Sequence, residues 1–172
     1  MVYIGIGSNL GNRIKNIEKA KYLLGIYKIN ILKSSGYYET LSWPDPNKPK
    51  FINIVIQSNT KYSPKKLIDI FKIIENKLGR KKDFRNAPRI CDIDIISYRN
   101  RIVSNEISIP HKRMNKRNFV LVPLFEIAPD WRHPKTNKSI KRLIFSLPIK
   151  DITSIKHIWF NVILIECLIQ TN

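Results

Sequence analysis

The stretch RICDIDIISY at residues 89–98 decides the fold, because polar and apolar side chains alternate at its centre. Asp92 and Asp94 are separated by Ile93, and Cys91 precedes them. In an extended strand, residues two apart lie on the same face, with their Cα atoms about 6.6 Å apart. We therefore predict a strand that presents two neighbouring carboxylates on one face and apolar side chains on the other.

Outward from this strand, hydrophobic periodicity predicts two helices and three further strands. Asn12 suits a helix cap, Pro64 suits a first helical turn, and Gly25 and Gly79 suit helix ends. The expected order is strand 2–6, helix 12–25, strand 28–40, strand 51–59, helix 64–79 and strand 89–98. This β-α-β-β-α-β order predicts an α+β, ferredoxin-like sandwich with an antiparallel sheet and both helices on one face. A hairpin at 99–109 and short helices near 118–128 and 140–145 complete the prediction.

Composition favours a folded domain with an anionic ligand. The chain has 172 residues, of which 43% are hydrophobic, and this excludes a disordered basic tail. Lys and Arg number 31 against 13 Asp and Glu, so the net charge is +18, which suits a polyanion. The alternative is genomic drift, since the abundant Ile, Lys and Asn have AT-rich codons. Only clustered basic residues therefore count as evidence.

Cysteine content and the two ends of the chain bear on compartment and domain number. Cys91 and Cys167 can build neither a disulfide framework nor a zinc site. The opening MVYIGIGSNLGNR lacks the basic region of a signal peptide, and the apolar run 158–169 is shorter than the roughly 20 residues of a membrane span. We expect a cytoplasmic monomer without a membrane partner, with one domain at 1–155 and an apolar C-terminal extension of unknown role at 156–172.

A basic arm leads into the strand that carries the two acids. Between residues 77 and 89 one acid, Asp83, stands against the bases Lys77, Arg80, Lys81, Lys82, Arg85 and Arg89, and a second basic cluster follows at 111–117. Arg grips phosphate oxygens in pairs, and Lys adds point charge. Mg²⁺ accepts a few carboxylates together with water and phosphate, and such acids can hold two ions about 3.5–4 Å apart. The pattern predicts a metal–polyphosphate site, and the alternative is a solvated charged surface.

The N-terminal glycines do not form a known phosphate loop. GIGSNLG at residues 5–11 is a near miss for the dinucleotide fingerprint, because its third glycine comes one residue late and no parallel β-α-β unit follows. No P-loop sequence occurs in the chain. We interpret these glycines as turn residues with close backbone packing.

Five blocks of the chain resemble one enzyme family. RNAPRICDIDII at 85–96 resembles the signature of the 6-hydroxymethyl-7,8-dihydropterin pyrophosphokinases. YIGIGSNLG at 3–11, FIN at 51–53, IPH at 109–111 and RNFVLVPLFEIAP at 117–129 are similar to further blocks of that family, in the right order. The resemblance implies the ferredoxin-like fold and a folate-biosynthesis enzyme with two Mg²⁺ ions. It also implies transfer of pyrophosphate from ATP to the pterin hydroxymethyl group, which releases AMP.

The resemblance also assigns roles by position. Metal binding falls on Asp92 and Asp94, and catalysis on these two acids with Arg80 and Arg89. ATP contacts fall on Glu75, Lys82, Arg85, Ile95, His111 and Arg117, and pterin contacts on Thr40, Phe51, Asn53, Asp92 and Phe119. These types suit the chemistry, because a flat heterocycle stacks between two aromatic rings and a carboxamide pairs with its polar edge.

Two alternatives stay open. RNA-recognition domains share this topology and suit a basic chain, but they expect aromatic residues where the strand at 89–98 carries acids. We therefore expect no nucleic-acid partner. An inactive relative is the other alternative, because Leu41 stands where the family usually has a proline after Thr40. Magnesium-dependent release of AMP in the presence of the pterin separates the three hypotheses.

Overall fold

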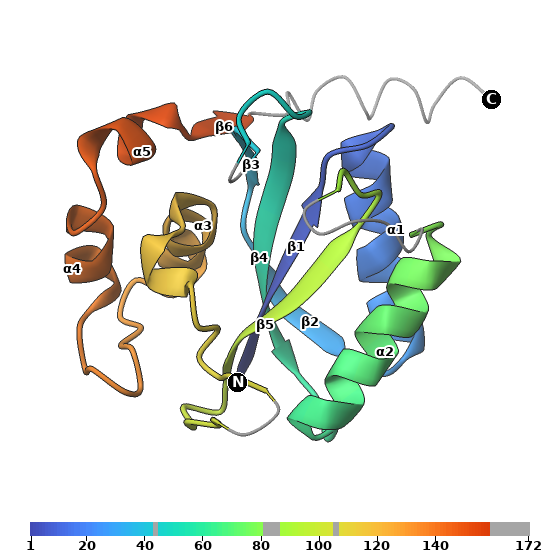
Figure 1. The fold of residues 1–172 in the computed structure, drawn as a ribbon. Coiled ribbons are helices and arrows are strands. Elements are labelled where there is room, and N and C mark those ends of the chain that lie inside the picture. Colours follow the sequence, from blue (N-terminus) through green and yellow to red (C-terminus); the bar gives the residue numbers. More distant parts are fainter. Residues whose placement is uncertain (43–44, 81–86, 105–106, 159–172) are drawn as a thin grey trace, which may run out of the picture.

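The computed structural model describes residues 1–42, 45–80, 87–104 and 107–158 (Figure 1). Its elements are β1 (Val2–Ser8), α1 (Arg13–Ile26), β2 (Asn30–Ser34), β3 (Tyr37–Thr40), β4 (Phe51–Asn59), α2 (Pro64–Lys77), β5 (Asp92–Tyr98), the 3-10 turn η1 (Met114–Lys116), α3 (Asn118–Ile127), α4 (Ile140–Phe145), α5 (Ile149–Ser154) and β6 (Lys156–Ile158). The first six predicted elements are thus present in the predicted order.

Local capping explains where α1 and α2 begin and end. The side chains of Asn12 and Ser63 each accept a hydrogen bond from the backbone N–H three residues later, at 3.0 and 3.3 Å. Pro64 lies in the first turn of α2, where a missing N–H costs nothing. Gly79 follows α2 with φ +92°, a conformation that favours glycine. Gly25 lies inside α1, so the predicted stop comes one residue early.

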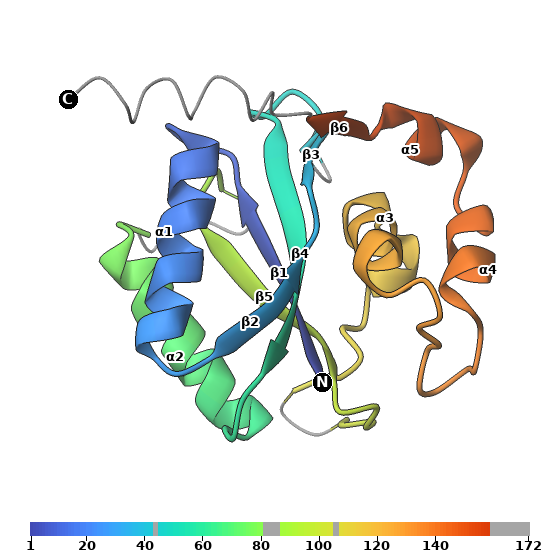
Figure 2. The same ribbon diagram turned by 180° about the vertical axis from the view of Figure 1, so that it is seen from behind.

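The described strands form one antiparallel sheet in the order β5-β1-β4-β3-β6, and β2 pairs with β4 as well. Helices α1 and α2 cover one face of this sheet, and α3 and α4 lie on the other (Figures 1 and 2). A β-α-β-β-α-β chain with its first strand between the third and the fourth is the ferredoxin-like arrangement. The predicted α+β fold is therefore confirmed.

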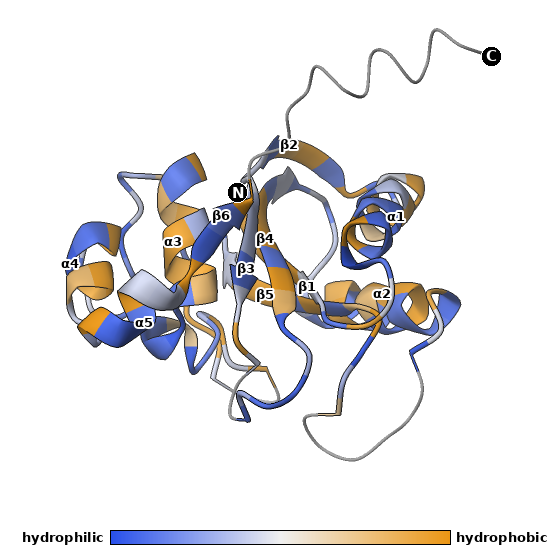
Figure 3. Ribbon diagram, turned by 90° about the horizontal axis from the view of Figure 1, so that it is seen from above, coloured by the Kyte–Doolittle hydropathy of each residue, from blue (hydrophilic) through white to orange (hydrophobic). Residues whose placement is uncertain are grey.

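Two apolar cores lie on opposite faces of the sheet. Alternate residues of β1, such as Ile4 and Ile6, pack with α1 and α2, and Cys91 and Ile93 join the same core. Val55 of β4 packs instead with the apolar helix α3, which lies between the sheet and α4 (Figure 3). Because side chains alternate along a strand, Asp92 and Asp94 must face α3. This confirms the faces predicted for the strand.

Two predicted segments differ from the structure. The strand expected at 28–40 is broken into β2 and β3, because Ser35 leaves the ladder and bonds Val55 through its own N–H and its hydroxyl, at 2.9 and 3.0 Å. Of the hairpin expected at 99–109, the described residues form one bridge, between Val103 and Ile109, and residues 105–106 lie outside the described ranges. The break between β2 and β3 thus arises from a contact with β4, which hydrophobic periodicity does not encode.

The C-terminal region adds two short elements that the sequence did not predict. Helix α5 and strand β6 have six and three residues, too few for a clear periodic pattern. β6 pairs with β3, so the sheet extends three residues past the expected boundary at 155. The remaining residues 159–172, with Cys167, lie outside the described residues. Among the described helices, none has the length and apolar character that a membrane span requires.

Candidate active site

Two carboxylates and one carboxamide flank the glycines of β1 on the α3 face of the sheet. We call Gly5 and Gly7 the glycine row. In the register of the sheet, Asp92 lies opposite Gly7 and Asp94 opposite Gly5, and Gly7 in turn lies opposite Asn53 of β4. Neighbouring strands are about 4.8 Å apart, so Asn53 and Asp92 stand about 10 Å apart at their Cα atoms. Gly7 itself places no side chain between them, and the Asn53 carboxamide lies over it. A Cβ on Gly7 would lie 2.7 Å from Asn53 Oδ1.

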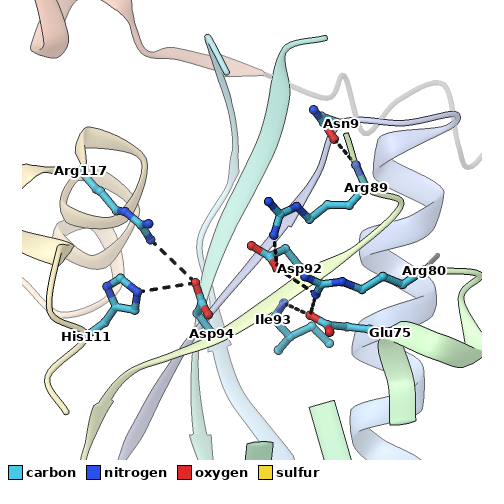
Figure 4. A network of polar contacts seen from close by, with 9 residues as sticks. All are labelled: Asn9, Glu75, Arg80, Arg89, Asp92, Ile93, Asp94, His111 and Arg117. Carbon is cyan, nitrogen blue, oxygen red and sulfur yellow. Dashed lines mark hydrogen bonds and ion pairs between the residues drawn. The ribbon is translucent and has the colours of Figure 1, made fainter. Parts of the chain in front are cut away.

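Two guanidinium groups hold Asp92. Arg80 and Arg89 each place Nη1 next to Asp92 Oδ1, at 3.0 and 2.9 Å (Figure 4). Behind them, the buried Glu75 pairs with Arg80 and accepts a hydrogen bond from the Ile93 N–H at 2.8 Å. Glu75 therefore joins the end of α2 to the start of β5. Its contacts orient Arg80 towards the carboxylates.

The backbone of Arg89 is fixed by the turn that follows β1. The Arg89 N–H donates to Asn9 Oδ1 at 2.7 Å, and the Asn9 N–H donates to the Arg89 carbonyl at 3.1 Å. Asn9 also donates through Nδ2 to the Pro49 carbonyl at 3.1 Å. Arg89 thus starts from a rigid backbone, which favours a reproducible position for its guanidinium.

Asp94 faces a second pair of nitrogen groups. Arg117 Nη1 lies 3.7 Å and His111 Nε2 lies 3.9 Å from Asp94 Oδ2 (Figure 4). Burial and the charge of Asp92 raise the pKa of Asp94 to about 6, although Arg117 acts in the opposite direction. Burial, with Arg117 and Arg113, lowers the pKa of His111 to about 4. His111 is therefore neutral at pH 7 and offers a hydrogen bond rather than a charge.

Two aromatic residues line the cavity on the Asn53 side of the glycine row, and we call this part of the cavity the aromatic slot. Phe51 of β4 and Phe119 of α3 line it, and the Arg117 guanidinium lies over the Phe119 ring with its Cζ 5.3 Å from the centroid. Asn53 Nδ2 donates to Thr40 Oγ1 at 3.0 Å, and both residues are buried. The Thr40 contact fixes the plane of the carboxamide. A fixed carboxamide that shares a cavity with two aromatic rings can bind the polar edge of a flat heterocycle.

These groups line one cavity of about 310 Å³. It brings together many of the predicted site residues: Thr40, Phe51, Asn53, Arg80, Arg89, Asp92, Asp94, His111, Arg117 and Phe119. Glu75 lies behind Arg80 and outside the lining. The side chain of Ile95 belongs to the core on the opposite face, since it is one residue from Asp94, so the structure does not bring it to the cavity. Lys82 and Arg85 lie outside the described residues.

The structure also adds residues that the sequence analysis did not assign to the site. Gly5 and Gly7 line the cavity within strand β1, so their interpretation as turn residues is wrong, although their close packing is confirmed. Their alternation with Ile4 and Ile6 was the available signal, because it leaves one strand face bare. Arg113 lines the cavity too, and it lies in the second basic cluster of the sequence.

The donor set suits a magnesium ion bound together with phosphate. Within the described ranges, no group of three or more His, Cys, Asp or Glu side chains could hold a metal ion. Asp92 and Asp94 supply two carboxylates instead, and Mg²⁺ commonly takes one or two carboxylates and completes its shell with water and phosphate. Four cavity arginines, Arg80, Arg89, Arg113 and Arg117, exceed the two acids in charge and leave a net attraction for an anion.

The ferredoxin-like sandwich thus places paired carboxylates, clustered arginines and two aromatic rings around one cavity, a set of groups that suits a metal ion together with phosphate. The chain belongs to the 7,8-dihydro-6-hydroxymethylpterin-pyrophosphokinase (HPPK) family, whose model matches residues 3–129.

Curated relatives are of two sizes. The 2-amino-4-hydroxy-6-hydroxymethyldihydropteridine pyrophosphokinase of Aquifex aeolicus is 38% identical over 145 residues, which is 81% of this chain and 88% of that protein. The Haemophilus influenzae protein of the same name is 38% identical over 74% of this chain and 81% of its own length. The folic acid synthesis protein fol1 of Pneumocystis carinii is 40% identical over 88% of this chain, but the match spans only 20% of its length.

Solved structures agree with the fold. A crystal structure of Plasmodium falciparum HPPK-DHPS with pteroate matches 92% of this chain and 46% of that chain, with a TM-score of 0.74 and 15% identity. An HPPK-DHPS in complex with substrates matches 83% of this chain and 42% of that chain, with a TM-score of 0.66 and 17% identity. At these identities the likeness establishes the fold alone.

Proposed function

We propose that this chain transfers pyrophosphate from ATP to the hydroxymethyl oxygen of 6-hydroxymethyl-7,8-dihydropterin, in folate biosynthesis, and releases AMP. The observation that carries the proposal is the strand register, which places Gly7 of the glycine row between Asp92 on one side and Asn53 on the other. A pterin bound at Asn53 between Phe51 and Phe119 directs its substituent along this row towards the carboxylates. Membership of the pyrophosphokinase family supports the same reaction.

The triphosphate of ATP belongs at the carboxylate end. Arg80, Arg89 and Arg117 supply charged donors for phosphate oxygens, and neutral His111 adds a hydrogen bond. Lys82, Arg85 and the backbone near Ile95 are further proposed ATP contacts. Glu75 is a proposed ATP contact as well, and its ion pair with Arg80 supports the position of that guanidinium.

Asp92 and Asp94 are the proposed ligands of two Mg²⁺ ions. When bound, these ions neutralise the charge that builds up on the phosphates. The two acids share one face of β5, and burial with their mutual repulsion already raises the pKa of Asp94 to about 6. A cation next to both carboxylates relieves that repulsion, which favours binding.

The remaining chemistry requires positioning. The pterin hydroxyl oxygen forms a bond to the β-phosphorus of ATP while the bond from that phosphorus to the AMP oxygen breaks, and the hydroxyl proton is released to solvent. The nucleophile is the substrate itself, so the chain needs no nucleophilic Ser or Cys. Stacking between Phe51 and Phe119 and the fixed Asn53 carboxamide hold the pterin in place. Arg80 and Arg89 neutralise the phosphoryl group during transfer.

A direct test is AMP release from ATP with magnesium and the pterin. We expect release that requires all three components and stops when the metal is chelated. ATP hydrolysis that is independent of the pterin contradicts the proposal. The proposal also includes the monomeric state and the cytoplasmic location that the sequence analysis expects.

A further inference from the structure

Helix α3 carries a carboxylate two turns beyond the ring that lines the aromatic slot. Phe119 and Glu126 are seven residues apart, so they lie on the same side of the helix. Both oxygens of the Glu126 carboxylate lie 3.1 Å from the Gly36 N–H, and Oε2 accepts a hydrogen bond from the Tyr38 hydroxyl at 2.9 Å. The far end of α3 is therefore bound to the start of β3.

Strand β3 continues this connection into the slot. Tyr38 and Thr40 are two residues apart, and both are buried on the α3 face of the sheet. Tyr38 bonds Glu126, while Thr40 accepts the hydrogen bond that fixes the Asn53 carboxamide. One short strand thus links the position of α3 to the position of the amide.

The short strand β6 closes the outer side of this group. His157 pairs with Tyr38 across the sheet, and the two rings contact edge to face with centroids 4.8 Å apart. A Cβ on Gly36 would lie 2.1 Å from His157 Nε2, so a larger residue at this position would displace the His157 ring. His157 lies beyond residues 3–129, which the family model matches. In the view from above, β6, β3 and α3 lie together (Figure 3).

We propose that the hydrogen bond from Tyr38 to Glu126 sets the distance between α3 and β3, and with it the width of the slot between Phe119 and Asn53. This inference rests on the proposed function, since the slot is assigned to the pterin. Tyr38 and Glu126 are positioning residues, because neither lines the cavity within the described part of the chain. Gly36 and His157 support them from the outer side.

The chain provides a matched control for the test. Tyr37 is the neighbour of Tyr38 and donates its hydroxyl to Glu18 of α1, on the opposite face of the sheet. Tyr37→Phe and Tyr38→Phe therefore each remove one tyrosine–glutamate hydrogen bond and keep the ring. Only the second variant loosens α3.

The experiment measures the Kd of the pterin by titration calorimetry, with magnesium and a non-hydrolysable ATP analogue present. We expect Tyr38→Phe to raise the Kd of the pterin about fivefold, the equivalent of one hydrogen bond, and to leave the Kd of the analogue unchanged. Tyr37→Phe should leave both values within about twofold of wild type, since its bond does not reach α3. Glu126→Gln keeps an acceptor for Tyr38 and should fall between wild type and Glu126→Ala.

The outcomes distinguish failure of the positioning role of Tyr38 and Glu126 from failure of the proposed function. An equal rise for Tyr37→Phe and Tyr38→Phe, or no rise for Tyr38→Phe, overturns the inference and leaves the proposed function intact. A wild-type chain that binds no pterin overturns both. Thermal unfolding of each variant shows whether the two substitutions cost similar stability, so that a selective change in pterin affinity is assigned to the slot.

Discussion

Replacing Arg89 with lysine distinguishes two hypotheses about this residue: that it binds phosphate oxygens during transfer, or that it is only part of a charged surface. Arg89 directs one nitrogen to Asp92 at 2.9 Å, and its guanidinium has further N–H groups next to the cavity. Lysine keeps the charge but loses the planar fork that grips two phosphate oxygens. The loss of one such transition-state contact corresponds to about 2.7 kcal/mol, or about a 100-fold lower rate.

The backbone around Arg89 should survive the change. Its anchor to Asn9 runs through main-chain atoms of Arg89, and Asp92 keeps its contact with Arg80. We therefore expect a free energy of unfolding within about 1 kcal/mol of wild type, because partly exposed ion pairs contribute little. Stability and catalysis should separate in this variant.

The assay is AMP release in a single turnover with saturating ATP and pterin, followed by rapid quenching. Arg99→Lys is the matched control, because Arg99 donates to the Thr60 carbonyl and lies outside the cavity lining within the described residues. It should react at the wild-type rate. A wild-type rate for Arg89→Lys as well would refute the reasoning and return Arg89 to the charged surface.

Three further substitutions test the rest of the site. Asp94→Ala should lower the rate of AMP release about 10²- to 10³-fold at saturating magnesium, and near-normal turnover would contradict the metal assignment. Asn53→Ala should weaken pterin binding by about 1–3 kcal/mol in calorimetry, because the polar edge of the ring loses its partner. Equal weakening for ATP would place Asn53 outside the slot. Gly7→Ala introduces a Cβ 2.7 Å from Asn53 Oδ1. It should weaken pterin binding and lower the unfolding free energy by about 1–3 kcal/mol, as seen by calorimetry and thermal melting. Unchanged pterin affinity in this variant would show that the cavity tolerates a methyl group at position 7.

Local sequence determined the parts of the site that depend on strand period and helix caps. Asp92 and Asp94 had to share a face because they are two residues apart in a strand, and the structure confirms it. Asn12 and Pro64 marked the helix starts for the same local reason. The order of the elements then limited the sheet to few topologies. The resemblance to the family blocks supplied the roles that we propose for individual residues.

Only the tertiary structure decided which distant residues meet. The register that aligns Asn53, Gly7 and Asp92 depends on three strands pairing at once, and no local pattern encodes it. Glu75 is predicted near the nucleotide, and its ion pair with Arg80 follows only from the packing of α2 on β5. Ile95 shows the converse, since strand period alone sends its side chain away from the cavity.

The C-terminal elements show the same division most clearly. Residues 156–158 have no periodic signal of their own, and their strand exists because β3 offers an edge with which to pair. The contact of His157 with Tyr38 and the glycine at position 36 are then fixed by close approach in space. Local sequence determines strand period and helix caps, whereas the distant partners of a residue are determined only when the whole chain is folded.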